Sequence, residues 1–177
     1  MTGTKTKKLV LAAICLALCV ILPLLFHAVP NGGSIFLPMH IPVLICGLMC
    51  GSVYGALCGA MGPLLSSLIT GMPPLSMAPA MMVECMVYGL VCGLLMKFIK
   101  TGKNIADIYI SLSLSMLLGR IVAGFAKALI FTPGVSPFAW VITSLATGIP
   151  GIVIQLVLIP LLITSLEKAG LLGKRYE

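Results

Sequence analysis

Residues 36–69 read FLPMHIPVLICGLMCGSVYGALCGAMGPLLSSLI, and this stretch decides the fold. It contains no Asp, Glu, Lys or Arg, so it is apolar enough to enter a lipid bilayer. As one helix it would be about 50 Å long at ~1.5 Å per residue, well beyond a hydrocarbon core of about 30 Å. Prolines interrupt it, and Gly51 lies near its middle. We therefore predict two shorter helices, about 38–50 and 53–69, joined by a tight turn at Gly51.

The composition of the whole chain agrees with a membrane protein. Of its 177 residues, 60% are apolar and 8% are charged, and the mean hydropathy is +1.20. A soluble domain has roughly 45–50% apolar and about 25% charged residues. These few charges cannot cover the surface of a soluble globule, and such high hydrophobicity also excludes a disordered chain.

Four further apolar runs have the length of membrane-spanning helices. We expect them at about 9–29, 75–96, 105–131 and 138–166, the last one kinked because it contains two prolines. The predicted fold class is therefore an all-α integral membrane protein with six transmembrane helices, in a single transmembrane domain over residues 1–177.

The positions of the cations predict the orientation. Nine of the eleven Lys and Arg residues border apolar runs in three clusters: Lys5, Lys7 and Lys8; Lys97, Lys100 and Lys103; Lys168, Lys174 and Arg175. Six helices place all three clusters on one side of the membrane, which the positive-inside rule makes the cytoplasmic side. We expect a cell-membrane protein with both termini cytoplasmic. The clusters contain no aromatic residue placed to stack on bases, so nucleic acid is not an expected partner.

No catalytic or metal-binding motif is present in the sequence. The seven cysteines all lie in apolar runs, form no C-x-x-C pair and are interpreted as small packing residues. The chain has no P-loop, no Gly-x-Ser-x-Gly elbow and no H-E-x-x-H sequence. We expect neither an enzyme nor a cofactor or metal site.

Three charged residues lie inside predicted spans, where charges are costly and usually functional: Glu84, Arg120 and Lys127. Arg120 and Lys127 are seven residues apart and share a helix face, with the small residues Ala123 and Gly124 between them. Glu84 can pair with only one of these cations, and we expect the deeper Arg120. Either the pair is structural and Lys127 extends to the interface, or one cation remains for an anionic or strongly polar ligand.

Other polar side chains would gather in the outer half of the bundle. With the three charges, they predict a small pocket for a polar ligand that opens outward. The additional candidate substrate-binding residues are Asn31, His40, Ser67, Tyr88, Trp140 and Gln155. Trp140 also suits the aromatic belt at a membrane surface.

Several segments carry a resemblance to a known family. They are Ala13 to Ala17 (AICLA), 37–43 (LPMHIPV), 63–74 (PLLSSLITGMPP) and 84–89 (ECMVYG). Over essentially its whole length, the chain resembles the substrate-binding S components of energy-coupling-factor (ECF) vitamin transporters.

The resemblance implies a subunit of an ECF-type ABC importer that captures a vitamin from outside. It implies a scaffold transmembrane subunit and two ATPase subunits as partners, with ATP hydrolysis assigned to the latter. By the same resemblance, Ala13 and Ala17 would contact the scaffold, and residues 30–35 would cover the pocket.

The substrate is open to two interpretations. Arg120 and Lys127 together favour a carboxylate, which points to pantothenate. Glu84 with His40 would instead suit a pyridine such as a pyridoxine-like compound. An alternative function is a stand-alone secondary carrier for a small polar or anionic solute, although no internal repeat is evident.

Overall fold

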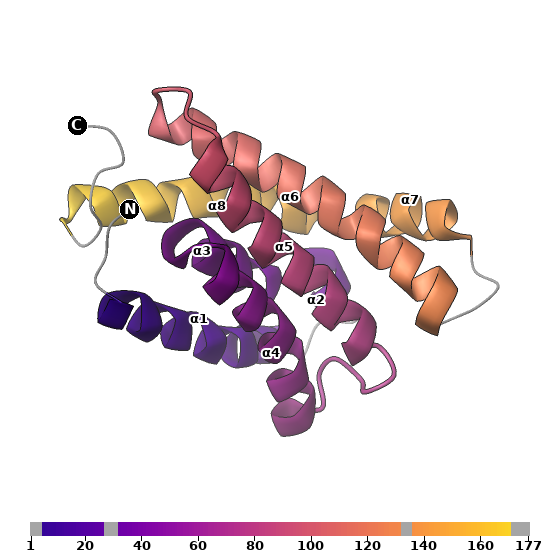
Figure 1. Cartoon of the computed structure of the whole chain (residues 1–177). Helices are drawn as coiled ribbons and strands as arrows, with labels where there is room; N and C mark the ends of the chain where they lie inside the picture. Colours follow the sequence, from indigo (N-terminus) through magenta and orange to yellow (C-terminus); the bar gives the residue numbers. More distant parts are fainter. Residues whose placement is uncertain (1–4, 27–31, 132–135, 171–177) are drawn as a thin grey trace.

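The computed structural model describes residues 5–26, 32–131 and 136–170, and these residues form helices without strands (Figure 1). In chain order the elements are α1 (Lys5–Leu25), α2 (Gly32–Phe36), α3 (His40–Cys50), α4 (Ser52–Thr70), α5 (Ala78–Phe98), α6 (Asn104–Ala126), the π-helix η1 (Lys127–Phe131), α7 (Pro137–Thr147) and α8 (Ile149–Lys168). Six described helical segments are long and apolar enough to cross a membrane. The predicted all-α membrane fold class is confirmed.

The stretch that decides the fold divides into two helices as predicted. α3 ends at Cys50 and α4 begins at Ser52, with Gly51 alone between them. Gly51 has φ +100°, in the region that residues with a Cβ rarely adopt. The glycine therefore allows the chain to reverse within one residue.

The last span differs from the prediction of one kinked helix over 138–166. The structure divides this segment at Gly148 into the short α7 and the longer α8. Pro150 lies in the first turn of α8, where its missing N–H costs no hydrogen bond. Only α8 is long enough to span a bilayer; α7 is a short apolar helix.

The ends of several helices meet at one end of the bundle, which we call the basic end. Figure 1 shows the start of α1, the end of α8 and the connection between α5 and α6 on the same side. The described lysines of all three clusters therefore lie at this end: Lys5, Lys7, Lys8, Lys97, Lys100, Lys103 and Lys168. Assigning the basic end to the cytoplasm remains a prediction of the positive-inside rule.

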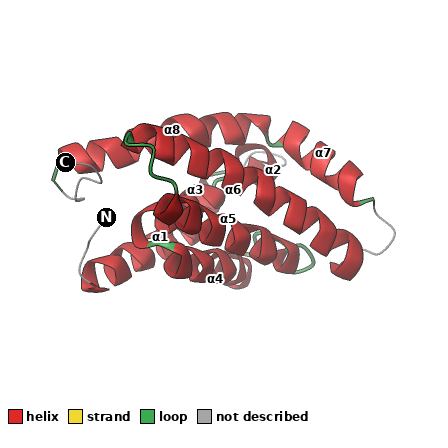
Figure 2. Ribbon diagram, turned by 45° about the horizontal axis from the view of Figure 1, so that its top comes forward, coloured by secondary structure: helices red, strands yellow, loops and turns green. Residues whose placement is uncertain are grey.

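Helix α5 runs through the bundle and contacts α3, α4 and α6 (Figure 2). Glycines allow this close packing. A Cβ atom on Gly55 would overlap the backbone of Gly89, and one on Gly59 would overlap the backbone of Cys85. A Cβ on Gly47 of α3 would lie 2.6 Å from the Gly89 carbonyl oxygen. The glycines at four-residue spacing thus bring helix backbones into contact, as small residues do in membranes.

We predict that Gly59→Ala lowers the free energy of unfolding by about 1–3 kcal/mol, because the methyl group forces α4 and α5 apart. The matched control is Gly33→Ala in α2, where an added Cβ meets no atom within 4 Å. Thermal unfolding in neutral detergent compares the two variants. Equal melting temperatures for both would show that the α4–α5 contact can relax without cost.

Candidate functional site

A group of polar side chains is buried in the half of the bundle away from the basic end. Glu84 lies in the second turn of α5, and His40 is the first residue of α3. Glu84 is 6% exposed and His40 is 1% exposed. Burial of such groups in an apolar medium is costly unless they find partners. The contacts of these side chains therefore indicate which groups remain to bind a ligand.

Glu84, His40 and Tyr88 form one compact group, which we call the Glu84 cluster. The Nε2 atom of His40 lies 3.6 Å from Oε1 of Glu84. The hydroxyl of Tyr88 donates a hydrogen bond of 3.0 Å to the same oxygen. Glu84 and Tyr88 are four residues apart and share one face of α5. The Tyr88 ring also packs against Gly119 of α6, where a Cβ would overlap it.

The expected pairing of Glu84 with Arg120 was wrong. Within the described residues, the basic side chain within 4.0 Å of Glu84 is that of His40, which forms an ion pair with Glu84 when it is protonated. The Nη1 atom of Arg120 instead donates a 2.8 Å hydrogen bond to the carbonyl oxygen of Ser144, near the end of α7. The carbonyl end of a helix carries partial negative charge and favours a cation. The break between α7 and α8 supplies this carbonyl end inside the bundle.

Gly148 makes room for the guanidinium group of Arg120. A Cβ atom at Gly148 would lie 2.8 Å from Nη2 of Arg120 and 3.1 Å from Cδ1 of Leu37. The residue between the two helices is therefore also a wall of the site. The sequence Gly148-Ile-Pro150 is the signal that could have located this break.

Several buried polar atoms of this region have no hydrogen-bond partner among the described residues. They are His40 Nδ1 and Nε2, Arg120 Nε, and Oγ of Ser67 in the last turn of α4. Leaving a buried donor or acceptor unsatisfied costs about 1–3 kcal/mol. Since His40 Nε2 faces Glu84 at 3.6 Å, the atoms available to bind a polar ligand are Nδ1 of His40, Nε of Arg120 and Oγ of Ser67.

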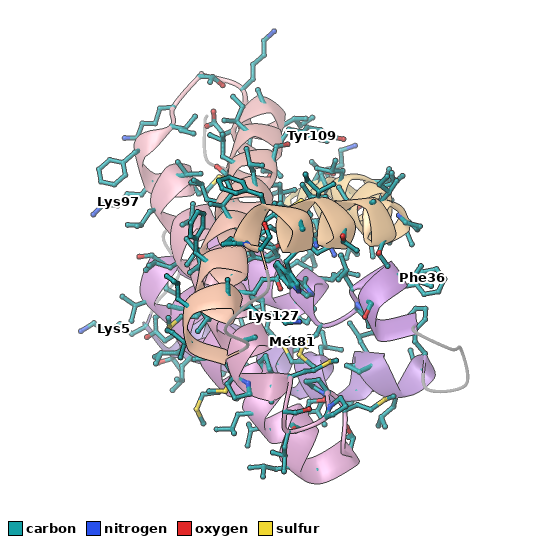
Figure 3. The ribbon with its side chains drawn as sticks, turned by 90° about the vertical axis from the view of Figure 1, so that its right-hand side faces the viewer. Lys5, Phe36, Met81, Lys97, Tyr109 and Lys127 are labelled. Atoms are coloured by element: carbon teal, nitrogen blue, oxygen red, sulfur yellow. The ribbon has the colours of Figure 1, made fainter. Side chains whose placement is uncertain are left out.

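Lys127 lies at a distinct position from the Glu84 cluster. It begins η1, and its Nζ atom is 5.2 Å from the centre of the Trp140 ring. A Cβ on Gly124 would contact Val141 and Trp140, so α7 packs against the small residues between Arg120 and Lys127. In Figure 3, Lys127 lies over the middle of the bundle, whereas Lys5 and Lys97 extend from its edge.

The segment before α3 connects the site to α8. Gln155 of α8 is 1% exposed, and its Nε2 atom donates a 3.3 Å hydrogen bond to the carbonyl oxygen of Leu37. Leu37 has φ +50°, which is uncommon for a residue with a Cβ. A Cβ on Gly151 would lie 2.8 Å from the Ile35 carbonyl oxygen, so α2 packs closely on α8. Of the predicted cover over residues 30–35, Pro30 and the candidate Asn31 lie outside the described residues, and the rest lies in α2.

The structure leaves the two small residues of α1 on its surface. Ala13 and Ala17 are exposed, while Cys15 and Cys19 of the same helix are buried against the bundle. This face is therefore open to lipid or to another protein. Its role as a scaffold contact remains a prediction.

A comparison with family models identifies the chain. The family described as "ECF transporter, substrate-specific component" matches residues 7–163. The chain belongs to this family. It is the substrate-binding part of a membrane transporter rather than an enzyme, as the sequence resemblance implied. Neither a comparison with curated proteins nor one with solved structures gives a match.

We predict that Tyr88→Phe destabilises this ECF component by about 1.5–3 kcal/mol, because a hydrogen bond to the buried Glu84 carboxylate is lost. Tyr54→Phe in α4 is the control, since its hydroxyl has no hydrogen bond to a described residue. Chemical unfolding in detergent micelles gives both values. A Tyr88→Phe variant as stable as Tyr54→Phe would mean that water or another group replaces the phenol.

Proposed function

We propose that this chain captures a small water-soluble vitamin from outside the cell and delivers it through an ECF-type ABC importer. The Glu84 cluster and Arg120 form the binding site. The observation that carries this proposal is that two buried nitrogens, Nδ1 of His40 and Nε of Arg120, have no hydrogen-bond partner among the described residues of an apolar bundle. A polar ligand would supply the missing hydrogen bonds.

The proposed transporter needs subunits that this chain does not replace. The sequence contains no P-loop, so ATP hydrolysis falls to two partner ATPase subunits. A scaffold transmembrane subunit would join them to this chain in the cell membrane. The exposed face of α1 at Ala13 and Ala17 offers a surface on which another helix can pack closely.

Among vitamins, we propose pantothenate as the substrate. Its carboxylate suits the guanidinium of Arg120, whose Nε atom has no partner among the described residues. Its hydroxyl and amide groups suit Glu84, His40 and Tyr88, which provide both donors and acceptors. A pyridoxine-like compound is the second candidate, because the close contact of Glu84 and His40 suits a polar heteroaromatic ring.

The carboxylate can be tested with a matched pair of ligands. We predict that the purified protein binds pantothenate about tenfold to a hundredfold more tightly than panthenol, the alcohol that lacks the carboxylate, because a charge-assisted hydrogen bond is worth ~1.5–3 kcal/mol. Arg120→Gln should remove this preference, and Lys127→Gln shows whether the second cation contributes. Isothermal titration measures each affinity. Tighter binding of pyridoxine than of pantothenate would contradict the pantothenate proposal and favour a pyridoxine-like compound as the substrate.

Coupling to partners can be tested on the exposed face of α1. We predict that Ala13→Trp with Ala17→Trp abolishes uptake in cells but leaves ligand binding to the isolated protein unchanged, because both residues are on the surface. Val157→Trp, at an exposed position of α8, is the control and should retain uptake. Uptake into vesicles that contain this chain alone, without ATPases, would support the stand-alone carrier instead.

A further inference from the structure

A second concave site lies at the basic end, away from the Glu84 cluster. It is a cavity of about 430 Å³ lined by Lys8 of α1, Lys97 of α5 and Lys100 of the connection that follows. We call it the lysine cavity. Its volume falls within the range of about 300–1,000 Å³ that is typical of small-molecule sites. Three cations from two separate parts of the chain therefore surround one hollow.

The lysines of this cavity lack an acidic partner within the described residues. None of the three has a carboxylate oxygen of a described residue within 4.0 Å. The described carboxylates are engaged elsewhere. Glu84 contacts His40, Asp107 accepts hydrogen bonds from Thr101, and Glu167 accepts them from Asn104. Lys97 and Lys100 are exposed, and the net positive charge of the cavity attracts an anion from outside this part of the chain.

The backbone at the cavity adds to its positive potential. α4 begins at Ser52, which lines the cavity together with Gly51. No side chain caps this helix start, and the N-terminal end of a helix dipole favours a negative charge. The helix dipole therefore adds to the positive potential of the three lysines that line the cavity.

The apolar residues at and beside the cavity point to an amphipathic ligand. Leu48, Met49 and Met96 line the same cavity as the lysines. These three side chains belong to the core, but Leu9, Val53 and Phe98, which follow the cavity residues Lys8, Ser52 and Lys97 in the chain, are 60–72% exposed. A free anion such as inorganic phosphate would bring no apolar part to cover these exposed side chains. A membrane lipid has both a phosphate group and apolar chains, and it is present at high local concentration where helices leave the bilayer. Basic pockets between transmembrane helices are suited to anionic lipid headgroups.

We propose that the lysine cavity binds the phosphate headgroup of an anionic phospholipid from the leaflet at the basic end. The three ammonium groups hold the phosphate, and the exposed side chains of Leu9, Val53 and Phe98 beside the cavity receive the glycerol and the start of an acyl chain. This site is separate from the proposed vitamin site, so we expect each ligand to bind without changing the affinity for the other. The lipid would also anchor α1 to the α5–α6 connection, which the cavity joins.

The test uses the full chain purified in neutral detergent, with bound lipids counted by native mass spectrometry. Phosphatidylglycerol is the probe, and phosphatidylcholine, glycerol 3-phosphate and inorganic phosphate are the comparisons. The cavity variant carries Lys8→Gln, Lys97→Gln and Lys100→Gln. The matched control carries Lys5→Gln, Lys7→Gln and Lys103→Gln, which remove the same charge from the same segments outside the cavity.

We expect one phosphatidylglycerol molecule to bind in preference to phosphatidylcholine. The cavity variant should bind it about a hundredfold more weakly, at about fivefold for each lysine, and the control should lose less than tenfold. The three Lys→Arg changes should retain binding, which keeps the test valid if the Gln variant folds poorly. Equal losses in variant and control would overturn the proposal, because diffuse surface charge would explain them. Displacement by glycerol 3-phosphate or by a Glu-rich peptide at equal concentration would overturn the assignment to lipid.

Discussion

The close approach of α5 to α3 and α4 is the contact on which the rest of the structure depends. Gly47, Gly55 and Gly59 meet the backbone of α5 at Gly89 and Cys85, where no larger residue fits. Lipid is as apolar as the helices, so association relies on such van der Waals contact and not on a hydrophobic driving force. This packing fixes the position of α3 along the axis of α5. It thereby places His40 beside Glu84.

The polar site is assembled from irregular backbone as much as from side chains. Arg120 binds the Ser144 carbonyl oxygen at the break between α7 and α8, and Gln155 binds the Leu37 carbonyl oxygen where φ is positive. At membrane depth, irregular backbone is tolerated only where protein or a cavity covers it. Each of these carbonyl oxygens also accepts a backbone hydrogen bond, from Gly148 N and His40 N respectively, so it is shared between the backbone and the side chain. A polar ligand would therefore meet side chains that these hydrogen bonds already hold in position.

Helix α5 connects two regions of opposite chemistry. Its first turns carry the carboxylate of Glu84 among buried donors, and its last turn carries Lys97 into the lysine cavity. The two residues are about 20 Å apart along the helix at ~1.5 Å per residue. This separation suits a component that binds its proposed substrate near one membrane face and lipid or partners near the other.

The sequence by itself determined the membrane class, the six spans and the division at Gly51, because hydropathy and helix length are local properties that a bilayer of known thickness constrains. It also singled out Glu84, Arg120 and His40, since polar groups in apolar runs stand out. Only the tertiary structure decided that His40 and not Arg120 is the ion-pair partner of Glu84. It alone brought Lys8 to Lys97 and Lys100. The physical reason is that side-chain partners depend on helix packing and on backbone carbonyls, such as that of Ser144, which residue type does not reveal.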